Sequence, residues 1–270
     1  MNRATLTILA VLLLGVAVPS STNAQDVNYY NVNKIDFLTQ TGLASPTTDT
    51  FAFGSVVGQT SGGSLSSGSL TLPAGSASAS PLAYILNGNG NLSLSGPNSP
   101  TQAGLDAEYN TGTYVFNING GSGSYSASIT TPADAYPAST PTITNTNWSG
   151  GALVIDPAQS FTLTWNSFSN FSTGDSVQLF DSSGAFNFFY NTNTTSQTFA
   201  ADTFAPNTSY AFTLGFSDDA ANNDSSIPNA LGEALYINDT RFTVQAPEPS
   251  TTAILSIGMG FLYFICRRGR

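Results

Sequence analysis

The stretch SYAFTLGF at Ser209–Phe216 places a large apolar side chain at every second position. Because successive side chains of a β-strand point to opposite faces of its sheet, this alternation predicts a strand with one buried face. Seven other segments alternate in the same way: SLTLP (Ser69–Pro73), NLSLS (Asn91–Ser95), GTYVFNI (Gly112–Ile118), SYSASIT (Ser124–Thr130), SFTLTWNSF (Ser160–Phe168), SVQLF (Ser176–Phe180) and RFTVQA (Arg241–Ala246). No window between residues 25 and 246 has a helical period. We therefore expect an all-β body made of one or two antiparallel β-sandwiches.

Turn signals divide this body. The segments NINGGSGSYS and FDSSGAF predict hairpin turns, because Gly, Asn and Ser adopt the required backbone conformations. Prolines cluster at Pro132, Pro137 and Pro141, and no strand pattern crosses them. We place a boundary near Ala138, which predicts one sandwich domain at 25–138 and a second at 139–246. A single larger sandwich is the alternative.

The second half resembles fibronectin type III and immunoglobulin-like modules. FTLTWNSF places Trp165 in a segment similar to strand B, and GDSVQLFDSSG is similar to strand C and its turn. FAPNTSYAFTLGFSD is similar to the corner that leads into strand F. The resemblance implies a buried Trp165 and a Tyr210 hydroxyl bonded to the upstream backbone. It implies a fold and no function.

Composition excludes several classes of function. The chain has no histidine, and Cys266 is its one cysteine, so a Cys–His zinc site and an intramolecular disulfide are impossible. No Gly-x-Ser-x-Gly motif is present for a serine nucleophile. Between residues 25 and 246 there are only two basic residues, Lys34 and Arg241, and fifteen acidic residues. Because an acidic body repels phosphate backbones, we expect that the protein does not bind nucleic acid. The missing histidine and the missing serine motif lead us to expect that it is not an enzyme.

The N-terminus, MNRATLTILAVLLLGVAVPSSTNAQD, has the three parts of a signal peptide. Arg3 provides the positive region, an apolar run follows from Leu6 to Val18, and Thr22 and Ala24 place small residues before a cleavage site. We predict that residues 1–24 are a signal peptide. The protein is then exported, and the mature chain begins at Gln25.

The C-terminus, APEPSTTAILSIGMGFLYFICRRGR, carries an uncharged run from Thr251 to Cys266. The run predicts a single membrane helix, although it is shorter than the roughly 20 residues that span a bilayer comfortably. A basic cluster follows it and is expected on the cytoplasmic side; it consists of Arg267, Arg268 and Arg270. The triplet Pro247, Glu248 and Pro249 precedes the run, and its prolines keep the junction extended.

The triplet, the apolar run and the basic cluster, in that order, resemble the PEP-CTERM sorting signal of Gram-negative bacteria. The resemblance covers residues 247–270. It implies that an exosortase recognises the triplet and removes the tail, after a transient stay in the inner membrane. It also implies a cell-surface or extracellular destination, and exopolysaccharide and biofilm as partner and setting.

Two groups of acidic residues are candidate sites in the body. The segment FSDDAANNDSS supplies oxygen ligands of the type that calcium prefers, on what we predict to be a loop. These residues are Asp218, Asp219, Asn222, Asn223 and Asp224; a solvated acidic loop is the alternative. Asp106 and Glu108 lie two residues apart, which would place both on one face of a strand as a glycosidase pair. A structural or solvated role for both carboxylates is the favoured interpretation, because exposed carboxylates are ordinary.

Together these features predict an exported, non-catalytic protein of the surface or matrix, sorted by an exosortase through its tail. A carbohydrate-binding module or adhesin is the alternative. A glycosidase that uses a carboxylate pair is a third and weaker hypothesis.

Overall fold

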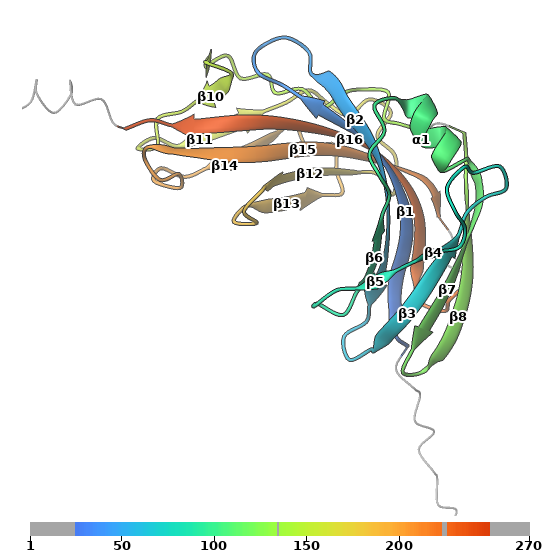
Figure 1. Cartoon of the computed structure of the whole chain (residues 1–270). Coiled ribbons are helices and arrows are strands. Elements are labelled where there is room, and N and C mark those ends of the chain that lie inside the picture. Colours follow the sequence, from blue (N-terminus) through green and yellow to red (C-terminus); the bar gives the residue numbers. More distant parts are fainter. Residues whose placement is uncertain (1–24, 134, 223–225, 249–270) are drawn as a thin grey trace, which may run out of the picture.

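A computed structural model of the chain describes residues 25–133, 135–222 and 226–248 (Figure 1). Its elements in chain order are β1 (Val27–Thr39), β2 (Thr47–Gln59), β3 (Leu65–Thr71), β4 (Leu82–Ala83), β5 (Ile85–Leu86), β6 (Leu92–Ser95), α1 (Gln102–Glu108), β7 (Gly112–Gly120), β8 (Gly123–Thr131), β9 (Trp148–Ser149), β10 (Ala152–Val154), β11 (Phe161–Thr164), β12 (Ser176–Asp181), β13 (Asn187–Tyr190), β14 (Ser196–Phe199), β15 (Thr208–Asn222) and β16 (Leu231–Ala246). The prediction of a mainly β body is confirmed.

One long sheet runs through the whole body in the order β13-β12-β15-β16-β1-β2-β6-β5, and β9 and β10 extend it beside β16. Two smaller sheets, β4-β3-β7-β8 and β11-β14, complete the structure. β15 and β16 are the longest strands and extend from the β12–β13 end to the end beside β1 and β8 (Figure 1). The expectation of purely antiparallel sheets was wrong, because β16 pairs in parallel with both β1 and β10.

The long sheet forms one side of each of two hydrophobic cores. The first core packs β1, β2, β6 and α1 against β3, β7 and β8, and Phe53 stacks on Tyr109 at 4.1 Å between ring centroids. The second core is rich in phenylalanine, and Phe168 stacks on Phe216 at 5.0 Å. Ile227, Ala230 and Ala234 from the second half of the sequence belong to the first core.

The predicted boundary near Ala138 falls in the connection between β8 and β9. The two segments that it separates nevertheless do not form separate sandwiches. β1 from the first segment and β16 from the second are adjacent in one sheet. The first core also includes residues of the second segment, from Ile227 onward. Sequence order fails as a guide here because a parallel strand pair joins distant parts of the chain.

Three polar side chains of β16 hold the proline-rich connection on the sheet. The Tyr236 hydroxyl donates to the carbonyl of Pro132 at 2.8 Å, and the Asn238 amide donates to that of Pro137 at 3.0 Å. The Thr240 hydroxyl donates to Pro141 O at 2.6 Å. All three side chains are buried, and each meets a backbone acceptor, as buried polar groups must. The proline-rich connection is therefore packed structure between the two cores.

The second half has the strand pairing that its resemblance implies. β11 pairs with β14, and β15 lies between β12 and β16, which corresponds to the B–E, C–F and F–G pairs of an immunoglobulin-like sandwich. Trp165 is buried and its indole N–H donates to Thr194 O at 2.7 Å. The Tyr210 hydroxyl accepts from the Ala205 N–H at 2.7 Å. The expectations for Trp165 and Tyr210 are therefore confirmed.

Nine of the described elements were not predicted: β1, β2, β4, β5, β9, β10, β13, β14 and α1. β1 does not alternate between apolar and polar residues as a half-buried strand should, because the chain's one lysine, Lys34, lies on the core-facing side of the strand. The Lys34 Nζ pairs with Asp106 Oδ1 at 2.5 Å. β2 is rich in Thr, Gly and Ser. α1 has seven residues, too few to show a helical period; Thr101 caps it by accepting from the Gly104 N–H at 3.1 Å.

Within the described ranges, no helix is both long and apolar enough to cross a membrane. The predicted signal peptide at 1–24 and the predicted membrane helix at 251–266 lie outside those ranges.

Asp26, next to the predicted new N-terminus, ties two turns to the first strand. Its carboxylate accepts from the Ser64 N–H at 2.8 Å and from the Ser122 N–H at 2.7 Å, and the Tyr125 hydroxyl donates to it at 3.1 Å. Burial opposes ionisation of Asp26, but these hydrogen bonds outweigh it and hold the pKa below its usual range.

The shared sheet predicts that the two cores unfold together. Leu70→Ala opens a cavity in the first core and should cost about 2–5 kcal/mol of unfolding free energy. Both tryptophans, Trp148 and Trp165, lie in the second half. Urea unfolding followed by tryptophan fluorescence should therefore show the full loss, whereas Leu43→Ala, at an exposed leucine, should change little. An unchanged fluorescence transition in Leu70→Ala would show that the halves are independent.

The hydrogen bonds of Asp26 predict a stability that depends on pH. A lowered pKa stabilises the fold above the unfolded pKa, and this contribution is lost as pH falls through the folded pKa. Asp26→Asn should lower the unfolding free energy by about 1–3 kcal/mol near neutral pH, as expected for hydrogen bonds to a charged group. The deficit should shrink in acid, as measured by urea unfolding across that range. A deficit that is constant with pH would contradict the assignment.

Candidate functional site

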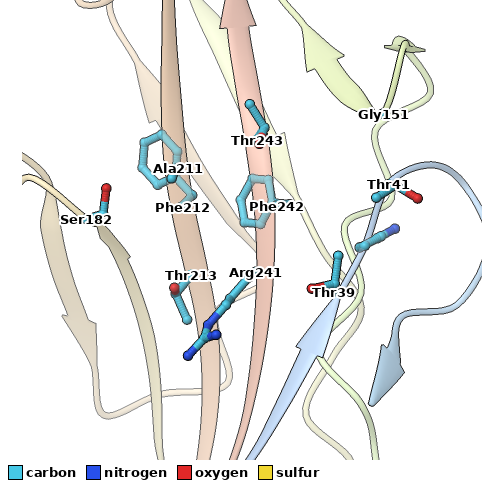
Figure 2. Close-up of a pocket in the computed structure, with 11 residues that line it drawn as sticks. Thr39, Thr41, Gly151, Ser182, Ala211, Phe212, Thr213, Arg241, Phe242 and Thr243 are labelled. Carbon is cyan, nitrogen blue, oxygen red and sulfur yellow. The ribbon is translucent and has the colours of Figure 1, made fainter. Parts of the chain in front are cut away.

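A hollow lies on β16 where its partner strand changes. β1 ends at Thr39, opposite Arg241, and β10 takes up pairing only at Val244, opposite Leu153. Neither β1 nor β10 pairs with the two residues of β16 that lie between these positions, Phe242 and Thr243. The hollow has a volume of about 330 Å³, and Figure 2 shows Ser182 on one side of it with Thr41 and Gly151 on the other. Its polar lining consists of Thr39, Gln40, Thr41, Ser182, Thr213, Arg241 and Thr243.

Strand register explains why these side chains meet. Thr213 on β15 and Thr39 on β1 are the cross-strand partners of Arg241 on either side, so all three project from the same face of the sheet. This face is opposite the one that carries Phe212 and Phe242 into the second core. The hollow is therefore a hydroxyl-lined surface site over an aromatic core.

Arg241 is the cation of this site. It is exposed, and its Cζ lies 3.9 Å from the centroid of the Phe37 ring, in the range of a cation–π contact. Within the described residues its guanidinium makes no ion pair or hydrogen bond with another side chain. The other cation of the body, Lys34, is buried and paired with Asp106. Arg241 is thus the one exposed cation in the part of the chain that the structure describes.

Asp239 lies beside this arginine on the same face of β16. Burial raises the pKa of its carboxyl to about 6, and the positive charge of Arg241 opposes that shift. Gly215 is its cross-strand partner, and a Cβ there would approach Asp239 Oδ1 to 2.5 Å. The missing side chain at Gly215 therefore makes room for the carboxyl.

The predicted calcium loop is not a loop in the part that is described. Asp218, Asp219 and Asn222 lie in β15, which continues beyond the alternating stretch because it pairs with β16, whereas Asn223 and Asp224 lie outside the described residues. Burial, then the charges of Asp175 and Asp219, raise the pKa of Asp218. No group of three metal-binding side chains occurs among the residues described. These observations give calcium no support.

Asp106 and Glu108 make structural contacts, in line with the interpretation that the sequence favours, and the weaker hypothesis of a glycosidase pair gains no support. Asp106 and Glu108 lie on α1 and not on a strand, so two residues of separation turn them about 200° apart. Asp106 pairs with Lys34, and Glu108 accepts from the Ser78 hydroxyl at 2.6 Å. Both carboxylates hold α1 in place, and they do not face a common substrate.

The predicted sorting triplet begins directly after β16. β16 pairs up to Ala246, which is buried opposite Thr208, and the exposed Pro247 and Glu248 follow at once. The third member, Pro249, lies outside the described residues, as do Arg267, Arg268 and Arg270.

No protein-family model matches the chain, and no curated protein matches it. Among solved structures it is similar to "Biofilm associated protein - BSP domain", at 14% identity and a TM-score of 0.21, covering 80% of this chain and 29% of that one. It is similar to "Cytokine receptor complex - Crystal form 1A" at 15% identity and a TM-score of 0.22, covering 74% of this chain and 94% of that one. The chain thus spans less than a third of the biofilm structure. TM-scores this low transfer neither fold detail nor function.

The hollow was not predicted, although the sequence contains a signal for it. Arg241 is one of two cations in a body with fifteen acidic residues, and the other is on a strand that sequence patterns missed. What the sequence lacks is the register that sets Thr39 and Phe37 beside Arg241.

The raised pKa of Asp239 predicts a stabilising substitution. A carboxyl whose folded pKa is raised costs nothing where both states are protonated, below its ordinary value of 3.8; the destabilisation grows as pH rises from there and is complete above about 6. Asp239→Asn should therefore raise the unfolding free energy by about 1–3 kcal/mol near pH 7.5 and by much less near pH 4. Urea unfolding at both pH values measures this difference. A variant that is less stable than the parent near pH 7.5 would contradict it.

Proposed function

We propose that the chain is an exported, non-catalytic protein of the cell surface or extracellular matrix, and that an exosortase sorts it through Pro247, Glu248 and Pro249. The observation that carries this proposal is the position of the triplet. β16 is paired on both sides near its end, and Pro247 and Glu248 are exposed directly after its last residue. A membrane-bound processing enzyme can therefore reach the junction without unfolding the body.

The N-terminal end supports export with cleavage before Gln25. Asp26 is buried and bonded to two turns, so the fold uses residues immediately after the predicted cleavage site. A chain that starts at Gln25 keeps all of these contacts. In this proposal exosortase and the inner membrane are transient partners, and the body then remains outside the cell with exopolysaccharide as its setting.

Glycan binding is the second candidate function of the body, and the hollow beside Arg241 favours it. Five hydroxyl-bearing side chains surround it. Hydroxyls donate and accept hydrogen bonds, as sugar hydroxyls require. The site lies on β16 and its neighbours and would survive removal of the tail.

Replacing Pro247, Glu248 and Pro249 together by alanine should abolish removal of the tail. The junction would lose both its extended backbone and its charged residue, while the paired body upstream stays intact. Intact-mass analysis and membrane fractionation in a host with an exosortase should show a full-length, membrane-bound product.

Gln245→Ala is a matched control, because Gln245 is exposed close to the triplet. It should be processed like the parent. Normal processing of the triple-alanine variant, or a parent chain that keeps its tail in the presence of the enzyme, would overturn the sorting proposal.

A further inference from the structure

The exposed cation of the described body lies in its hydroxyl-lined hollow. In a chain whose formal net charge is −10, an unpaired arginine favours an anionic ligand at that one position and nowhere else on the described surface. The arginine would otherwise be expected to pair with one of the many acidic side chains. Its closest acidic neighbour along the strand, Asp239, is buried and forms no ion pair with it.

The guanidinium is held in a geometry that suits a carboxylate. Its Cζ lies over the Phe37 ring at 3.9 Å from the centroid, a contact that favours this position of the side chain and uses none of its N–H donors. Arginine donors match the two oxygens of a carboxylate in a fork arrangement. Thr213 flanks the arginine with a hydroxyl that can bond to other parts of a ligand, and on the other side the Thr39 hydroxyl donates to Asp49 and can still accept a hydrogen bond.

The charge around the hollow limits the anion to one negative charge. The body repels polyanions, and Asp239 adds a negative charge beside the site above its raised pKa. A phosphate group at neutral pH carries more than one charge on average and gains less from a single arginine. A sugar ring that bears one carboxylate fits both the arginine and the hydroxyls, and the hollow of about 330 Å³ is of the size of small-ligand sites.

We propose that the hollow binds a uronic acid residue of a polysaccharide, with the sugar carboxylate on Arg241 and the ring hydroxyls on the surrounding threonines. This inference rests on the glycan-binding candidate and is independent of sorting through the tail. Phe37 is a positioning residue, because it holds the arginine. Asp239 opposes the ligand, because its charge has the same sign.

Titration calorimetry with the full-length chain in detergent tests the proposal. The probes are the monosaccharide galacturonic acid, which carries a single carboxylate, its neutral counterpart galactose, and inorganic phosphate. Galacturonic acid should bind, and Arg241→Gln should weaken this binding about tenfold or more, since a charge-assisted bidentate contact is lost. Arg241→Lys should recover only part of the affinity, and Asp239→Asn should strengthen binding.

Asn229→Asp is the matched control for charge. It changes the net charge by the same amount as Arg241→Gln, at an exposed turn residue whose left-handed backbone suits aspartate. It should leave binding unchanged, and thermal melting should show that each variant is folded. The proposal is overturned by equal binding of galactose and galacturonic acid, by binding of phosphate alone, or by equal losses in Arg241→Gln and Asn229→Asp. Absence of all binding also overturns it but leaves the sorting proposal intact, because tail removal is measured separately.

Discussion

The parallel ladder between β1 and β16 is the constraint on which the rest of the structure depends. It runs from Tyr29 opposite Leu231 to Thr39 opposite Arg241, and so joins the two ends of the described chain in the middle of the long sheet. A parallel pair needs a crossover connection, and here nearly the whole body is that connection. The sheet cannot be completed until the last strand has been made. Such distant pairing also favours slow folding, which suits a chain expected to fold after export.

The same ladder determines where both functional features lie. Because β1 ends at Thr39 while β16 continues to Ala246, the last third of β16 needs other neighbours. β10 supplies one only from Val244 onward, and the hollow is the space left between them. β16 then ends in the exposed Pro247 and Glu248. The hollow and the exposed residues that follow β16 thus lie close together along the chain.

β16 also explains how two cores stay in register without a disulfide. Its core-facing positions change in character along the strand: Ala234 serves the first core, and Phe242 and Val244 serve the second. Between them Asn238 and Thr240 are polar and buried, and they hold the proline-rich connection. Burying these polar side chains between the two cores costs little free energy, because each of them donates to a backbone carbonyl. Arg241 and its cross-strand partners Thr213 and Thr39 lie on the opposite face, outside both cores.

The sequence by itself determined the mainly β class, half of the strands of the body, the buried Trp165, the hydrogen-bonded Tyr210 and the acidic character that singles out Arg241. These follow from alternation, turn residues and charge, which act over a few neighbouring residues. Only the tertiary structure decided that β15 extends through Asp218 and Asp219, that Asp106 and Glu108 lie on a helix, and that the two halves share one sheet. Each of these depends on pairing or packing between residues far apart in the chain. Phe37 lies beside Arg241 for that reason, since strand register is set by the whole sheet and is not encoded in either segment alone.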